Sequence, residues 1–155
     1  MKLTRSPEVL VSEEQRSPLL LLLGLLGLVR SCSAQTPFKK FEVQHVQPNS
    51  LPCDQAMISV NKAAQKCTPT HTFLHKAPQD VIAICRLPTT PCRSGQNKCH
   101  LSACPVRMTE CQLIGKDQFP NCRYTDTHRV QNFIVACDPR QPGDPRDPLL
   151  PVYLD

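Results

Sequence analysis

The stretch NCRYTDTHRVQNFIVACD, residues 121–138, contains Cys122 and Cys137, and the second of these ends a run, Phe133–Cys137, that is rich in β-branched and aromatic residues. Such a run indicates a strand of an antiparallel sheet. Eight more cysteines precede the stretch, among them Cys53, Cys67, Cys85, Cys92, Cys99 and Cys111. This many half-cystines in a short chain predict a small extracellular domain stabilised by disulfides, although their spacing alone leaves the pairing open.

Zinc is the competing use of so many cysteines. Structural zinc sites usually take closely spaced cysteine pairs that are matched by a second pair downstream. The spacings of Cys92 with Cys99 and of Cys99 with Cys104 do not form such knuckles. The sequence therefore predicts no metal site, and nothing in it calls for a cofactor.

The amino terminus has the features of a signal peptide. Its apolar run, Leu19–Val29, follows three basic residues and precedes Cys32-Ser33-Ala34, which suits signal peptidase. The run is about half of the ~20 residues that a membrane-spanning helix needs, so no transmembrane segment is expected. We expect cleavage after Ala34 and secretion of residues 35–155 as one extracellular domain.

Cleavage would remove four of the 18 Lys and Arg residues and three of the 13 Asp and Glu residues, which leaves a net charge of +4. This mild surplus permits binding to RNA, anionic glycans or bacterial surfaces, but by itself it favours none of them strongly. A domain of this length buries only a modest core, so cross-links must offset part of its chain entropy.

Three segments predict short helices. Phe38–Val46 places Phe41 and His45 four residues apart on one face, so the phenyl ring can hold the imidazole against the domain. Asp54–Lys66 has apolar residues at helical spacing and an acidic residue in its first turn. Pro78–Ile84 begins with a proline, which suits the first turn of a helix.

Four segments predict strands: Thr72–Leu74, Val106–Leu113, Phe133–Cys137 and Leu149–Leu154. Between the last two, residues 138–148 carry several prolines and a glycine, which predicts a loop. Helices followed by antiparallel strands indicate an α+β domain.

The cysteines together with Gln44-His45, Asn121–Tyr124, Ile134–Asp138 and Pro151–Asp155 resemble the framework of the pancreatic ribonuclease A superfamily. The resemblance covers residues 38–155. Within the superfamily, the chain is most similar to the eosinophil-associated and epithelial host-defence branches, which combine RNA cleavage with killing of microbes.

The resemblance implies three short helices packed on a curved antiparallel sheet and a cis peptide bond at Phe119-Pro120. It implies four disulfides: Cys53–Cys111, Cys67–Cys122, Cys85–Cys137 and Cys92–Cys99. Cys104 is then left over. It can remain a buried thiol, be capped by a small thiol, exchange with the Cys92–Cys99 loop or link two chains, and the protein is otherwise expected to be a monomer.

RNA cleavage by transphosphorylation needs a base for the 2′-hydroxyl proton, a positive charge or donor for the phosphorane, and an acid for the leaving 5′-oxygen. The resemblance implies that His45 is the base. Thr68 stands where the family has the stabilising lysine, and Tyr153 stands where it has the acidic histidine. A hydroxyl carries no charge, and a phenol with a pKa of ~10 is a poor acid at neutral pH. The expected activity is therefore weak or absent.

Three other residues, Lys66, His75 and His128, are candidates to replace the missing groups. None of them occupies a position that the family uses for chemistry. We therefore do not expect any of them to restore full activity.

The resemblance implies six residues near the RNA: Gln44, Thr72, Lys40, Arg93, Lys98 and Asp155. Thr72 would read a pyrimidine, while His71 replaces the asparagine that precedes it in the family. Lys98 replaces an asparagine that reads the second base, so preference for a purine there should weaken while attraction to phosphate persists. Arg93 and Lys98 are also compatible with ordinary solvated loop charges.

Two functions of different classes fit these residues. The preferred one is a catalytically silent protein that uses the disulfide scaffold to bind RNA or anionic surfaces in host defence. The alternative is a pyrimidine-preferring endoribonuclease of reduced activity, with His45 as base and Tyr153 as a poor acid. Decay of the gene fits the odd Cys104 equally well.

Overall fold

Three helices and seven strands form residues 35–155, the part of the chain that this computed structural model describes. The helices are α2 (Pro37–His45), α3 (Cys53–Ala64) and α4 (Pro78–Ile84). The strands are β1 (Thr70–Leu74), β2 (Thr89–Thr90), β3 (Cys99–Leu101), β4 (Val106–Ile114), β5 (Arg123–Gln131), β6 (Ile134–Pro139) and β7 (Leu149–Leu154). The expected signal peptide lies outside the described residues.

The three predicted helices are present, and their ends follow from local chemistry. The hydroxyl of Thr36 accepts a hydrogen bond of 3.1 Å from the backbone N–H of Lys39 and so caps α2. Helix α3 ends at Ala64, two residues before the predicted end, because Gln65 adopts a left-handed conformation with a φ of 55°. Helix α4 covers the predicted range.

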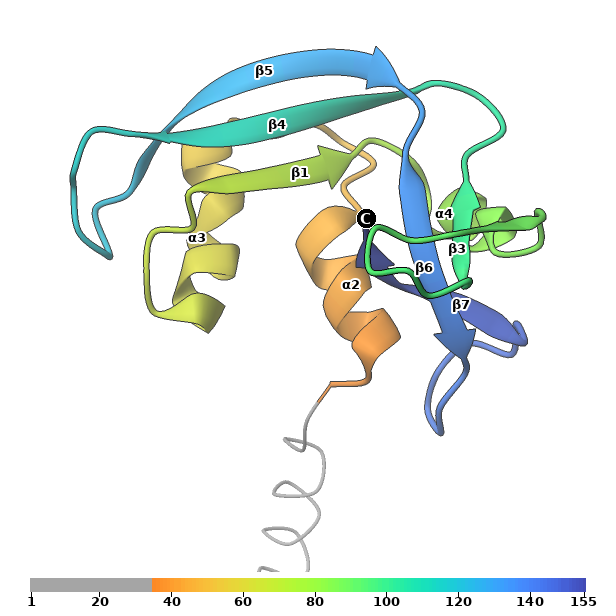
Figure 1. Cartoon of the computed structure of the whole chain (residues 1–155). Helices are drawn as coiled ribbons and strands as arrows, with labels where there is room; N and C mark the ends of the chain where they lie inside the picture. The colour runs from red at the N-terminus through yellow and green to blue at the C-terminus, as the bar shows by residue number, and fades with distance from the viewer. Residues whose placement is uncertain (1–34) are drawn as a thin grey trace, which may run out of the picture. The chain divides into compact units, whose positions relative to one another are not determined.

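The strands form two antiparallel sheets rather than one, with the orders β1-β4-β5 and β2-β3-β6-β7. Figure 1 shows the long β4–β5 pair arching above α3 and α2. Strands β6 and β7 lie below the right-hand end of this pair. The chain leaves β5 for β6 through a bend at Phe133. The backbone N–H of Phe133 donates to the Ser102 hydroxyl at 3.0 Å, and its carbonyl accepts from the Ser102 N–H at 2.9 Å. These bonds hold the bend that separates the sheets.

The sequence does not predict β5. This strand pairs only with β4, and Tyr124 is the one residue along it that is buried. An edge strand with both faces largely in water needs no alternation of apolar residues, so its sequence carries no strand pattern. Strand β6 also extends into the predicted loop, because Asp138 and Pro139 pair with β7. The proline lies at the end of the strand, where a missing N–H is tolerated.

Of four hydrophobic clusters in the described domain, two are large. The larger one, around Phe41, Leu74, Val81 and Val135, lies where α2, α4, β1 and β6 meet. The second, around Met57, Phe73 and Tyr124, packs α3 against the β1-β4-β5 sheet. The first cluster fixes the end of α2 against β1, and this contact positions the site described next.

The disulfides join Cys53 with Cys111, Cys67 with Cys122, Cys85 with Cys137, and Cys92 with Cys99, which are the pairs that the resemblance implies. Cys104 is free and exposed, so the buried-thiol alternative does not hold. The Phe119-Pro120 bond is cis. Among residues 35–155, no helix combines the length and the apolar character needed to cross a membrane.

Candidate functional site

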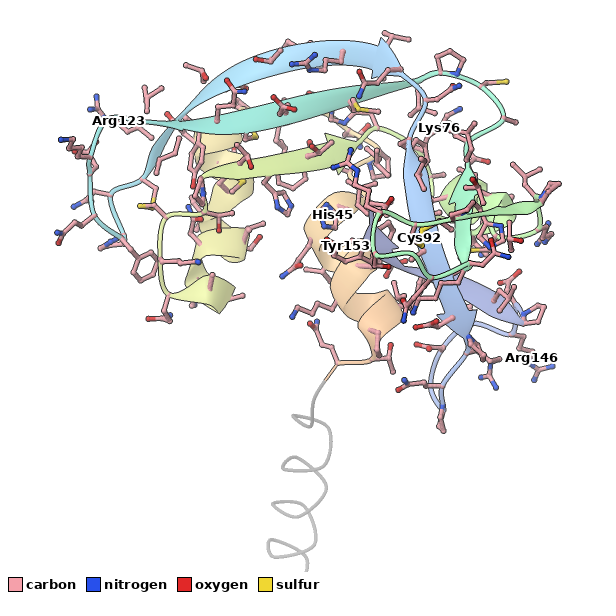
Figure 2. The ribbon with its side chains drawn as sticks, viewed as in Figure 1. His45, Lys76, Cys92, Arg123, Arg146 and Tyr153 are labelled. Carbon is pink, nitrogen blue, oxygen red and sulfur yellow. A yellow bond between two sulfur atoms is a disulfide. The ribbon has the colours of Figure 1, made fainter. Side chains whose placement is uncertain are left out.

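A cleft of about 770 Å³ opens where both sheets meet the end of α2. Its walls come from segments far apart in the sequence: His45 from α2, residues 70–72 from β1, residues 92–98 from the loop before β3, and Tyr153–Asp155 at the carboxy terminus. Figure 2 shows His45 and Tyr153 together in the middle of the domain, with Cys92 on the neighbouring loop. The cleft thus brings together His45 and Tyr153, the residues at the expected base and acid positions.

His45 is held in the form that a general base requires. Its Nδ1–H donates to the backbone carbonyl of Thr72 at 2.8 Å, because a carbonyl can only accept. Nε2 is therefore the nitrogen with the free lone pair. The Phe41 ring, 2% exposed, packs at 5.3 Å between ring centroids, as the helical spacing predicts. Burial, with a smaller effect from the neighbouring His71, lowers the pKa of His45 from 6.5 to about 4.

His71 is a second imidazole in the cleft. Its ring stacks on His45 with centroids 4.4 Å apart and planes 12° from parallel. Its Nε2–H donates to the backbone carbonyl of Gln44 at 2.6 Å. Burial lowers the pKa of His71 below its ordinary value. Both rings are therefore neutral near pH 7 when the cleft holds no anion.

Thr68 is half-buried and is not among the residues that line the cleft. Its backbone N–H donates to the side-chain oxygen of Asn61 at 2.8 Å, and its carbonyl accepts from the Tyr124 hydroxyl at 2.7 Å. These bonds tie the segment to α3 and β5. Lys66, two residues earlier, is exposed and also absent from the cleft lining.

Tyr153 lines the cleft and is 62% exposed. Its hydroxyl makes no hydrogen bond within the described domain, and Asp155 does not orient it. The Asp155 carboxylate instead accepts from the backbone N–H of Arg93 at 3.2 Å, which ties the carboxy terminus to the loop before β3. Asp155 therefore holds the wall of the cleft.

The charged residues of the cleft wall are nearly balanced. Lys98 pairs with Asp138 at 3.1 Å, and Glu110 contacts Arg129 at 3.5 Å. Two cations, Arg93 and Lys98, and two carboxylates, Glu110 and Asp155, line the cleft. The wall therefore carries little net positive charge when the imidazoles are neutral.

A smaller hollow of about 480 Å³ adjoins the cleft along α2. It is lined by Lys40, Gln44 and His45 on one side and by Tyr153 on the other. An RNA strand that extends from the cleft into this hollow would meet Lys40. The structure thus brings all the expected substrate-contacting residues to the cleft or to this adjoining hollow.

His75 and His128 do not face the cleft. The hydroxyl of the buried Thr109 contacts His75 Nε2 at 2.6 Å and His128 Nδ1 at 3.1 Å, and both histidines line a separate cavity of about 340 Å³. Neither histidine therefore lies at the cleft, where the missing acid would have to act.

The sequence did not single out Glu110 or Gln96 as cleft residues. Glu110 faces the cleft because β4 pairs with β1 in the register that sets it opposite Thr72. The expected strands contained Thr72 and Glu110, but only the pairing fixes that these two residues are opposite each other.

Within residues 35–155, one cluster brings together three side chains of the types that bind metal ions: Cys92, Cys99 and Asp155. The two sulfurs are joined to each other in a disulfide and so are not thiolates. This donor set does not suit a metal ion.

The buried imidazole of His45 should make stability depend on pH. Between pH 6.5 and about 4 the unfolded chain binds a proton at this residue that the folded protein does not, so stability is lost as the pH falls through this window. We expect the urea midpoint to decrease over this range, and to decrease less in His45→Gln. His128→Gln, at an exposed histidine outside the cleft, is the matched control. Equal slopes in wild type and His45→Gln would contradict the expectation.

The family model for pancreatic ribonuclease matches residues 36–155. Ribonuclease K3 of Sus scrofa is 50% identical over 141 residues, which cover 88% of this chain and 92% of the relative. Ribonuclease K6 of Bos taurus is 46% identical over 143 residues, covering 90% and 92%. Ribonuclease 8 of Saguinus oedipus is 43% identical over 141 residues, covering 88% and 90%. With the disulfide-linked α+β fold, these matches show that the chain belongs to the pancreatic ribonuclease family.

Proposed function

We propose that this protein is a secreted family member that binds single-stranded RNA in the cleft, cleaves it weakly or not at all, and acts in host defence. The observation that carries the proposal is Thr68 at the lysine position: its side chain has no charge, and it is not among the residues that line the cleft. Anionic glycans and bacterial surfaces are the alternative ligands, and they would be held by Arg93 and Lys98.

Of the three groups needed for transphosphorylation, the base alone is well placed. His45 offers a neutral Nε2 to take the 2′-hydroxyl proton. The absence of a charged stabiliser costs about 10² to 10³ in rate in comparable sites. Tyr153 can donate a proton, but a phenol is poorly matched as an acid to neutral pH. Much of the ~10²- to 10⁴-fold rate increase that general acid catalysis supplies is therefore lost. The cleft therefore supports binding better than turnover.

The binding mode predicts a specific dependence on salt. Each phosphate that a protein cation neutralises on a single strand contributes about −0.7 to the slope of log affinity against log salt. Arg93→Ala should reduce the slope by roughly 0.7. Lys98→Ala should change it less, because Lys98 is already paired with Asp138. Fluorescence anisotropy of a labelled uridine-rich oligonucleotide over a salt series measures both.

Arg146→Ala is the matched control, because Arg146 lies well away from His45 and Tyr153 (Figure 2) and is exposed. It should leave the slope unchanged. A flat salt dependence in the natural protein, or equal effects of Arg93→Ala and Arg146→Ala, would reject binding in the cleft. Salt-dependent capture of heparin but not of RNA would indicate the glycan alternative.

The second candidate function is a slow, pyrimidine-preferring endoribonuclease. The exposed Tyr153 hydroxyl at the cleft, which makes no hydrogen bond within the described domain, favours it. In this reading His45 Nε2 removes the 2′-hydroxyl proton, the 2′-oxygen attacks phosphorus, and Tyr153 protonates the leaving 5′-oxygen to give a 2′,3′-cyclic phosphate. RNA cleavage by the natural chain that His45→Ala abolishes would favour this function over silent binding.

A further inference from the structure

The cleft contains one imidazole more than the proposed chemistry uses. His71 is the second residue of β1, next to the pyrimidine-reading position Thr72, and it lines the same cleft as His45. Its ring is fixed on both sides, by the stack on His45 at 4.4 Å and by an edge contact with Phe73 at 4.8 Å. These contacts hold the ring in one orientation in the cleft.

The hydrogen bond of His71 fixes which nitrogen remains available. Nε2–H donates to the Gln44 carbonyl at 2.6 Å, so in the neutral ring Nδ1 carries the lone pair. Protonation at Nδ1 leaves the bond to Gln44 intact and strengthens it, because a charged donor makes the stronger hydrogen bond. His71 can therefore gain a positive charge without moving.

The groups that face His71 determine when it gains this charge. His45 comes from α2, Glu110 from β4, Arg93 and Lys98 from the loop before β3, and Tyr153 and Asp155 from the carboxy terminus. The two cations are matched by the two carboxylates, and Thr68 contributes no charge. Burial lowers the pKa of both imidazoles, and the adjacent His71 ring lowers that of His45 further, so both are neutral near pH 7 in the empty cleft. An entering phosphate is therefore met by no surplus positive charge.

We propose that His71 takes up a proton from solvent when a phosphodiester enters the cleft, and that its imidazolium supplies the positive charge that Thr68 does not. His45 stays neutral, because two stacked imidazolium rings would repel each other and a base must keep its lone pair. His71 is then a phosphate-binding residue. The inference rests on the proposed function, since it concerns how the same cleft holds RNA.

The test uses the uncleavable dinucleotide deoxyuridylyl-deoxyadenosine, whose phosphodiester keeps a single charge from pH 5 to 8. Proton NMR of the disulfide-bonded protein follows the imidazole signals of His45 and His71 through a pH titration, with and without the dinucleotide. We expect the midpoint of His71 to rise by about one unit or more when the dinucleotide is bound. By linkage, the dinucleotide then binds about tenfold or more tightly to the protonated form.

His71→Asn should remove this proton-linked part of the affinity, so its binding should be weaker at pH 5.5 and nearly independent of pH. An asparagine can still donate a hydrogen bond at this position but cannot be protonated. His128→Asn, at an exposed histidine outside the cleft, is the matched control and should bind as the natural protein does. A near-ultraviolet circular dichroism spectrum identical to that of wild type establishes that His71→Asn is folded.

Binding to wild type and His71→Asn with the same affinity and pH dependence would overturn the inference and leave RNA binding in the cleft intact. A midpoint shift of His45 instead of His71 would overturn it as well, because His45 would then be the residue that takes the proton. Failure of the wild-type protein to bind the dinucleotide anywhere between pH 5 and 8 would reject both the inference and the proposed function.

Discussion

The double change Thr68→Lys, Tyr153→His should raise the rate of cleavage of a short uridine-adenosine substrate by ~10³ or more. It introduces a cation to stabilise the phosphorane and an acid whose pKa is near neutrality. In comparable sites a charged stabiliser raises the rate by about 10² to 10³, and a general acid raises it by about 10² to 10⁴. The two effects need not multiply. The base that both groups need, neutral His45, is already in place through its bond to Thr72. A fluorogenic substrate measures the rate.

His45→Ala, made in both the natural and the doubly changed protein, shows whether any signal comes from this cleft. It should abolish cleavage by the doubly changed protein. If that protein binds RNA as the natural one does and yet cleaves it no faster, then the replaced positions do not limit catalysis. If the natural protein cleaves RNA and His45→Ala abolishes the activity, the slow endoribonuclease is the better description.

Removing the Cys85–Cys137 disulfide by changing both residues to Ala should lower the free energy of unfolding by about 4 kcal/mol, on a chain-entropy estimate for two cysteines 52 residues apart. Both residues also lie in the larger hydrophobic cluster, so lost packing adds to the effect. Small domains have total stabilities of about 5 to 15 kcal/mol, and this change should remove a large part of that. Urea unfolding measures it.

The matched control is removal of Cys92–Cys99, whose cysteines are seven residues apart. The same estimate gives about 2 kcal/mol. Both changes are best made with Cys104→Ser, because the exposed thiol of Cys104 could otherwise exchange with the remaining bonds. Equal losses for the two disulfides would show that loop length does not control the stabilisation here.

Comparison of the predicted and observed elements shows where local sequence is sufficient. Helix α4 begins with proline and ends after a short apolar segment, and its range was predicted in full. Strand β5 was missed, because an exposed edge strand gains its stability from backbone pairing with β4 and needs no apolar alternation. The extension of β6 to Pro139 was missed for a related reason, since it depends on a partner strand.

Part of the candidate site, too, was predicted from the sequence, and part was not. His45 and its packing against Phe41 follow from helical spacing and from the resemblance around Gln44-His45. The stack of His71 on His45 does not, because the two residues come from different elements that meet only when α2 packs on β1. The ion pair between Lys98 and Asp138, which are 40 residues apart, likewise forms only in the folded chain.

The sequence by itself determined the family, the α+β class and the identity of the groups at the base, lysine and acid positions, because cysteine framework, helical spacing and short motifs are local properties of the chain. Only the tertiary structure decided that there are two sheets, that Thr68 does not line the cleft, and that the charges of the cleft wall nearly cancel. These depend on which distant segments pack together, and strand register and side-chain pairing set that in three dimensions.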